Sequence, residues 1–179
     1  MRRLFLAVDL PPEAIGDLVR LQRGLRAGRR VAPENLHLTL AFLGEVDDPR
    51  AEALAESLES ARLDGAGVTI RGTGHFGGDR PRIVYAGVEP APDLARLESR
   101  LTRLAREAGI AVEARRFVPH VTLHRLHGLR EDAGPVAAFE AETQLFRLDP
   151  FRPWAVTLYQ SHLHPEGARY DPLAAFPLA

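Results

Sequence analysis

The chain has 179 residues, of which 45% are hydrophobic and 26% are charged, and its formal net charge is −1. This length and composition are typical of one globular domain with a sizeable core, and the near-zero charge argues against broad coating of nucleic acid. The chain has no cysteine, which excludes disulfides, thiolate nucleophiles and cysteine-ligated metals. All 23 basic residues are arginines, so Schiff-base chemistry on lysine and a Walker-type phosphate loop are excluded as well.

Met1 is followed by two arginines and a short apolar run, Leu4–Val8, which Asp9 and Pro11-Pro12 interrupt. The run is too short for the apolar part of a signal peptide, and no small-residue cleavage site follows it. No segment approaches the roughly 18–20 uninterrupted apolar residues of a membrane helix. We therefore expect a cytoplasmic protein that does not associate with membranes, and we expect a monomer.

Hydrophobic periodicity and turn residues predict an alternation of strands and helices. The clearest amphipathic helix carries Leu94, Leu97 and Leu101 on one face and ends at Gly109. In chain order, the prediction is strand Leu4–Asp9, a helix opened by Pro11-Pro12 and ending near Arg26, strand Leu36–Leu43, a helix capped by Asp48, strands Val68–Phe76 and Ile83–Val88, a helix from Leu94 to Ala108, strand Phe117–Leu126, a weak helix Glu131–Phe139 and strand Trp154–Leu163.

Two segments share the pattern histidine, apolar residue, threonine, apolar residue: His37–Leu40 and His120–Leu123. A chain of this composition is expected to contain about 0.09 such matches by chance. Each segment follows a strand and a helix in the predicted order, which indicates an internal duplication of a strand–helix–strand–helix–strand unit. We expect an α+β fold in which residues 1–179 form a single bilobal domain, with antiparallel sheets lining a central cleft and helices outside.

Each motif is expected to project one imidazole and one hydroxyl together, because residues two apart in a strand share a face. This pairs His37 with Thr39, and His120 with Thr122. An imidazole has an unperturbed pKa of about 6.5 and exchanges protons near neutral pH, and a hydroxyl donates to phosphate oxygens. Two such arms around one substrate provide a general acid and a general base. The residues alone do not assign which histidine has which role.

Strict alternation has further consequences for both strands. It places His124 on the face of His120, and it places Phe42 in the core, with stacking on a nucleobase as the alternative. It also places Arg125 on the opposite face from His120. A β-bulge or a strand end after Leu123 is therefore required if Arg125 is to reach the site.

The paired motifs resemble those of the two-histidine phosphoesterase superfamily. The chain is similar to the bacterial RNA 2′,3′-cyclic phosphodiesterase family, also called 2′-5′ RNA ligases, over almost its whole length. The segments that carry the resemblance are Arg3–Pro11, Asn35–Val46, Pro119–Arg125, Leu158–Ser161 and Arg169–Leu173. The resemblance is weakest between about His127 and Pro153.

The resemblance implies an enzyme that hydrolyses the 2′,3′-cyclic phosphate end of an RNA or oligonucleotide to a 2′-phosphomonoester, without a metal or another cofactor. It implies that His37 is the proton donor to the departing 3′-oxygen and that His120 is the proton acceptor from the attacking water. It also implies that Thr39, Thr122 and Arg125 bind the phosphate.

Three alternatives stay open. The pairs His120/His124 and His162/His164 offer nitrogen ligands for a metal, although neither cluster contains a carboxylate and the His-Glu-x-x-His pattern is absent. The same cleft is also suited to a non-catalytic module that binds nucleotides or RNA ends. Finally, 2′-5′ ligation is the reverse of a related phosphodiester cleavage, so it requires no additional residues.

Overall fold

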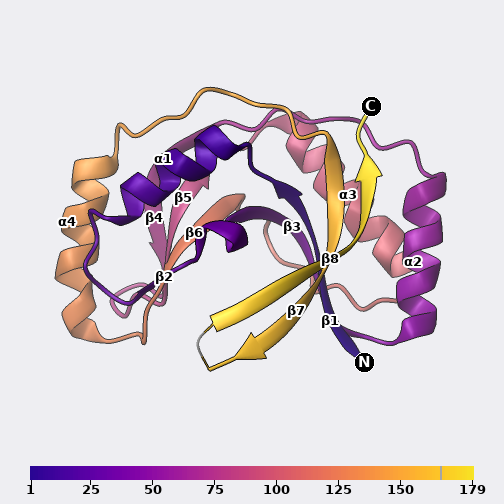
Figure 1. The fold of residues 1–179 in the computed structure, drawn as a ribbon, viewed down its shortest axis with the longest axis horizontal. Coiled ribbons are helices and arrows are strands. Elements are labelled where there is room, and N and C mark those ends of the chain that lie inside the picture. The colour runs from indigo at the N-terminus through magenta and orange to yellow at the C-terminus, as the bar shows by residue number, and fades with distance from the viewer. Residues whose placement is uncertain (166) are drawn as a thin grey trace.

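The computed structural model describes residues 1–165 and 167–179, and its strands there form one eight-stranded sheet of antiparallel pairs. The strand order is β4-β5-β6-β3-β1-β7-β8, with β2 paired to β6. Figure 1 labels the α-helices and the strands; two short 3-10 helices, η1 and η2, are not labelled there. Their bounds are β1 Arg2–Asp9, α1 Pro12–Gln22, β2 Arg29–Arg30, η1 Pro33–Asn35, β3 His37–Val46, α2 Asp48–Ser60, β4 Ile70–Phe76, β5 Ile83–Val88, α3 Pro92–Glu107, β6 His120–Arg125, η2 Arg130–Asp132, α4 Ala133–Thr143, β7 Ala155–His164 and β8 Gly167–Pro177.

The sheet has two parts, which meet where Leu38 of β3 pairs with Val121 of β6. One part contains β4, β5 and β6, and the other contains β3, β1, β7 and β8. Each part receives a strand from the other half of the chain, because β4 pairs with β5 and β7 pairs with β1. The expected two-lobed α+β fold is confirmed, with the difference that the two antiparallel sheets are continuous through this pairing.

The helices also pack on strands from the other half of the chain. The first helix, α1, contacts β6, and α3 packs on β3. Farther out, α4 lies against β4 and α2 lies against α3 and β8, so that α4 and α2 flank the sheet at its two ends (Figure 1). No helix in residues 1–165 and 167–179 combines the length and the apolar character needed to cross a membrane.

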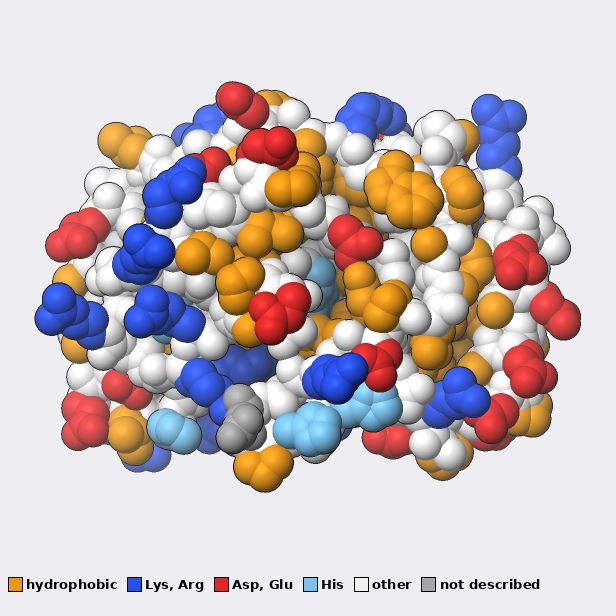
Figure 2. All heavy atoms as spheres, in the orientation of Figure 1, with side chains coloured by type: hydrophobic (Ala, Val, Ile, Leu, Met, Phe, Trp, Pro, Cys, Tyr) orange, Lys and Arg blue, Asp and Glu red, His pale blue; other side chains and the backbone are white. Residues whose placement is uncertain are grey.

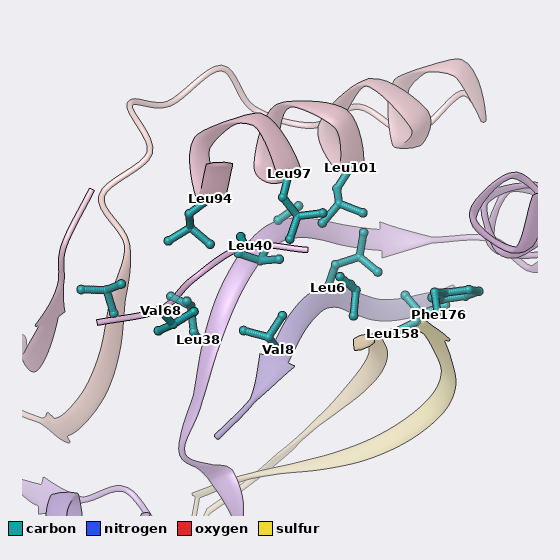
Figure 3. Close-up of a cluster of buried hydrophobic side chains, with 14 of the residues drawn as sticks. Leu6, Val8, Leu38, Leu40, Val68, Leu94, Leu97, Leu101, Leu158 and Phe176 are labelled. Atoms are coloured by element: carbon teal, nitrogen blue, oxygen red, sulfur yellow. The ribbon is translucent and has the colours of Figure 1, made fainter. Parts of the chain in front are cut away.

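The main core lies between α3 and the strands β1 and β3 (Figure 3). Leu94, Leu97 and Leu101 follow one face of α3 and point toward Leu38 and Leu40 of β3. Each fully buried leucine contributes about 1.5–3 kcal/mol through burial of apolar surface. This core covers the back of β3 and leaves its other face to the polar residues of the motif.

The predicted helices are confirmed, and the differences fall at their ends. The first helix stops at Gln22, before the expected Arg26. The residue that caps α2 is Asp47 and not the predicted Asp48, because the Asp47 side chain accepts a hydrogen bond from the backbone N–H of Arg50 at 3.1 Å. Either aspartate has the chemistry of an N-cap, and only the backbone conformation selects one of them.

The last strand, β8, is absent from the sequence prediction. It contains Pro172 and Pro177, and proline has no N–H to donate to a neighbouring strand. Because β8 lies at the edge of the sheet, it has a partner on one side only and tolerates both prolines.

A partly buried histidine attaches α4 to β4. His75 Nδ1 lies 2.6 Å from Glu140 Oε1, and His75 Nε2 lies 3.0 Å from the carbonyl oxygen of Gly78. Both ring nitrogens therefore face acceptors, and only the doubly protonated imidazolium donates to both. The hydrogen bond to Glu140 raises the pKa of His75 above its ordinary value of 6.5.

We predict that Glu140→Gln lowers the free energy of unfolding by about 1 kcal/mol at pH 5.5 and by less at pH 8.5. A raised histidine pKa stabilises the fold fully below pH 6.5, and that stabilisation is lost as the pH rises through the folded-state pKa. Urea unfolding at the two pH values measures the effect, with Glu142→Gln on the same helix as the control. Equal losses at both pH values would contradict the prediction.

Candidate active site

The pairing of Leu38 with Val121 brings the two His-x-Thr-x motifs together. The antiparallel register places each histidine level with the threonine of the other motif. Leu38 and Val121 are both fully buried, so the polar residues on either side of them lie on the opposite face of the sheet. His37 and His120 are therefore diagonal neighbours on adjacent strands, an arrangement in which residues are typically about 7–8 Å apart. The four side chains that share this space are those of His37, Thr39, His120 and Thr122.

Each imidazole makes the same backbone contact. His37 Nδ1 lies 2.8 Å from the carbonyl oxygen of Asn35, and His120 Nδ1 lies 2.7 Å from that of Val118. A carbonyl oxygen only accepts, so Nδ1 carries the hydrogen in both rings and Nε2 is the nitrogen that gains or loses a proton. Nε2 of His37 lies 3.0 Å from Thr39 Oγ1. The two motifs thus present matching tautomers.

Aromatic rings surround both imidazoles. His37 stacks on Phe5 and meets the edge of Tyr170, with centroid separations of 5.0 Å and 5.2 Å. The rings that contact His120 are Phe76, at 4.9 Å, and Tyr85, at 5.2 Å. These rings come from β1 and β8 on one side and from β4 and β5 on the other, so each lobe encloses its own histidine.

Burial lowers the pKa of both histidines. It is the largest cause for His37, whose pKa falls to about 4 even though the Asn35 carbonyl and the Asp9 carboxylate both act to raise it. Burial also lowers the pKa of His120, and the Arg125 cation lowers it further. Both rings are therefore neutral in the free protein at neutral pH.

The charged neighbours of the two histidines differ. Asp9 pairs with His37 across β1 and β3, whereas Gly87 pairs with His120 across β5 and β6. The Asp9 carboxylate accepts a hydrogen bond from the Tyr159 hydroxyl at 2.5 Å, which holds it beside His37. The site is thus built symmetrically, but among the described residues only His37 has a carboxylate beside it, which acts against the lowering of its pKa by burial.

A β-bulge follows the second motif and decides where the next residues point. Thr122 and His124 pair with adjacent residues of β5, which leaves Leu123 without a partner there. This is the kind of irregularity that Arg125 requires to reach the face of His120. The Arg125 cation accordingly lowers the pKa of His37 and of His120. The expectation that His124 shares a face with His120 is wrong, because the extra residue reverses the alternation.

His124 lies under the end of α1 and is 1% exposed. Its ring nitrogens are 3.0 Å from the carbonyl oxygen of Ala27 and 3.1 Å from that of Gln22. Since His120 and His124 lie on opposite faces of the sheet, they do not form the metal site considered as an alternative. In the described residues, no group of three or more His, Cys, Asp or Glu side chains is arranged to hold a metal ion.

Gln22 supports the bulge, and the sequence analysis did not identify it. Its amide nitrogen donates to the carbonyl oxygens of Leu123, at 2.8 Å, and Val31, at 3.0 Å, and the residue is 2% exposed. The available signal was a glutamine on the apolar helix face that carries Leu18 and Leu25. A buried amide at such a position requires partners, and here the partners are the strand that carries the motif and its neighbour.

The first motif has an equivalent bulge, at Leu40, because the register between β1 and β3 shifts after Thr39. The bulge turns Phe42 outward, where it is 68% exposed and lies 6.2 Å from Phe5 between ring centroids. The expectation that Phe42 packs in the core is therefore wrong. Phe42 occupies the place after the first motif that Arg125 occupies after the second.

Comparison with known proteins gives a consistent result. The family model described as "LigT like Phosphoesterase" matches residues 8–85 and 87–170, two segments that each contain one motif. The RNA 2′,3′-cyclic phosphodiesterase of Methanothermobacter thermautotrophicus is 33% identical over 98% of this chain and 98% of its own length. The protein of that name from Thermus thermophilus is 36% identical over 98% of this chain and 90% of its own length. The crystal structure of Escherichia coli LigT complexed with 3′-AMP superposes with a TM-score of 0.77 at 33% identity, covering 99% of this chain and 97% of that one.

We predict that the NMR signals of the histidine rings titrate in a defined order. His37 should titrate near pH 4 and His120 below pH 6.5, because both rings are desolvated. His75, which is hydrogen-bonded to Glu140, should titrate above pH 6.5 and serves as the internal control. Histidine-to-glutamine variants assign the signals. Titration of His37 and His120 at or above pH 6.5 would contradict the burial that the structure shows.

Proposed function

Since the chain belongs to the LigT-like phosphoesterase family, we propose that it hydrolyses the 2′,3′-cyclic phosphate end of an RNA or oligonucleotide to a 2′-phosphomonoester. The observation that carries this proposal is the pair of imidazoles on one face of the sheet, each with its Nδ1 hydrogen donated to a backbone carbonyl. The names of the two relatives, and the 3′-AMP bound to the Escherichia coli protein, support the same substrate class.

The reaction requires one proton to be taken and one to be given. Nε2 of His120 accepts a proton from water as the water oxygen attacks phosphorus. In the reactive form His120 is neutral and His37 carries a second proton, at Nε2, which it donates to the 3′-oxygen as the bond between phosphorus and that oxygen breaks. The product is a 2′-phosphate with a free 3′-hydroxyl, and proton exchange with solvent restores both rings. A general acid and a general base each contribute about 10²–10⁴-fold.

The charges beside each ring support this direction of proton transfer. Asp9 raises the pKa of His37 and so favours its acid form. Arg125 lowers the pKa of His120 and so favours the neutral ring that acts as base. Arg125 also lowers the pKa of His37, but only His37 has a carboxylate beside it to oppose this effect.

The other motif residues bind the substrate in this proposal. Thr39, Thr122 and Arg125 donate hydrogen bonds to the non-bridging phosphate oxygens, and these become stronger as negative charge develops in the transition state. The exposed ring of Phe42 stacks on the terminal base.

Some expectations from the sequence stay proposals. We propose a single bilobal domain that acts as a cytoplasmic monomer, and the strands and helices exchanged between the halves support a single domain. The reverse reaction, 2′-5′ ligation, uses the same residues and also stays a proposal.

We predict that His37→Ala and His120→Ala each lower kcat by about 10²-fold or more on an oligonucleotide with a 2′,3′-cyclic phosphate end, assayed in EDTA. Affinity for the 2′-phosphate-ended product should change much less, because the threonines and Arg125 remain. His164→Ala, outside the site, is the control. Equal loss of turnover and affinity in the two variants would favour the non-catalytic binding module. Activity that EDTA abolishes and zinc restores would favour the metal site.

The two desolvated imidazoles should also determine the pH dependence. We predict a bell-shaped profile of kcat/KM with its maximum below pH 6.5, because both pKa values are lowered in the free enzyme. The two limbs belong to the coupled pair. Asp9→Asn should move the bell to lower pH, because loss of the carboxylate disfavours the protonated form of His37. A profile that is flat from about pH 5 to 9 is incompatible with a pair of catalytic histidines.

A further inference from the structure

A second basic site lies behind the sheet, at the end of α1. Arg23, Arg26 and Arg30 line a cavity of about 510 Å³ together with Leu25, Gly28 and the buried ring of His124. The cavity therefore lies over the back of β6, on the opposite face from His120. The proposed reaction uses none of its arginines.

The arginines of this cavity have no acidic partners in the part of the chain that the structure describes. Arg23, Arg26 and Arg30 are exposed, and none of them forms an ion pair with a described carboxylate. Arg20, one turn earlier, is paired with Asp17. Three cations around a hollow without neutralisation leave a place for an anionic ligand, and this trio is distinguished by its continuity with the candidate active site through β2.

The pairing of β2 with β6 connects this cavity to the candidate active site. Arg29 pairs with Arg125, and Arg30 pairs with His124. Cross-strand partners share a face, so Arg29 lies beside the phosphate-binding Arg125 while Arg30 lies beside His124 on the back. Figure 2 shows basic side chains gathered around the place where Figure 1 labels β2. A basic surface thus continues from the active site around β2 to the cavity.

The chemistry of the substrate determines what such a surface binds. A 2′,3′-cyclic phosphate occupies both hydroxyls of the terminal ribose, so the rest of an RNA leaves only through the 5′-oxygen of that nucleotide. The next groups along the chain are phosphodiesters, each with one negative charge. An RNA substrate therefore has further negatively charged phosphodiesters that lie outside the active site, whereas a cyclic mononucleotide has none.

We propose that Arg23, Arg26 and Arg30 form a second binding site for the phosphodiester backbone of the RNA, on the 5′ side of the cyclic phosphate. This inference rests on the proposed function and specifies its substrate as a polynucleotide. The arginines act as phosphate ligands without reading the sequence of the bases, and their effect falls as salt screens the charges.

The test compares two substrates in one triple variant, called the α1–β2 variant, which carries Arg23→Gln, Arg26→Gln and Arg30→Gln. We expect kcat/KM for a cyclic-phosphate-ended 12-mer RNA to fall about tenfold or more at low salt. For a nucleoside 2′,3′-cyclic phosphate it should stay unchanged. The slope of log kcat/KM against log salt for the RNA should become shallower by about 2, since each contact with a single strand accounts for about 0.7.

A matched control is available on α3. Arg96, Arg100 and Arg103 line another hollow, on a helix that packs behind β3. The α3 variant, in which all three are glutamine, removes the same charge and should have the wild-type kcat/KM on both substrates. A thermal melt shows whether the α1–β2 variant folds. If it does not, Arg26→Gln alone is used, and its kcat/KM on the RNA should fall while its kcat/KM on the nucleoside cyclic phosphate stays unchanged. A variant that keeps wild-type kcat/KM on RNA, or loses it equally on both substrates, would overturn the proposal.

Failure of the proposed function would be seen separately, as a wild type that cleaves neither substrate. Fluorescence anisotropy with a 2′-phosphate-ended 12-mer RNA then still tests the second site. Weaker binding by the α1–β2 variant than by the α3 variant supports it, and equal binding by the two variants refutes it.

Discussion

The two lobes of the sheet meet at the pairing of Leu38 with Val121, and the candidate site depends on the register of that pairing. A shift of one residue in either strand turns its histidine and threonine to the back of the sheet, where α3 and α1 pack. The apolar residues that alternate with the motif residues oppose such a shift, because it would expose them to water. Burial of Leu38 and Val121 therefore positions the chemistry on the other face.

The two motifs have one design with different neighbours. Both imidazoles donate Nδ1–H to a backbone carbonyl, both are enclosed by aromatic rings, and both strands bulge at the fourth residue of the motif. The differences lie in the adjoining positions. Asp9 stands where the other half has Gly87, and Phe42 stands where the other half has Arg125. The duplicated structure thus places a carboxylate, Asp9, beside His37 only. It places an arginine, Arg125, after the second motif and an aromatic ring, Phe42, after the first.

The bulge at Leu123 links the front of the sheet to its back. It turns Arg125 toward the two histidines and places His124 under α1, and the Gln22 amide holds the Leu123 carbonyl oxygen in place. The same stretch of backbone therefore places Arg125 and Arg29 on the face of the two histidines and His124 and Arg30 on the face of the arginine-lined cavity. Local irregularity in one strand thus places Arg125 and His124 on opposite faces, and α1 stabilises it through Gln22.

The sequence by itself determined the class of fold, most of the elements and the four motif residues. Apolar periodicity marks segments that must bury one face, and a repeated motif remains visible without any structure. It did not determine the face on which Phe42, His124 and Arg125 lie, or the contacts of Asp9 and Gln22. Those depend on register, bulges and partners far along the chain, which strict alternation does not encode. Only the tertiary structure settled them, because a single unpaired residue reverses the direction of every side chain that follows it in the strand.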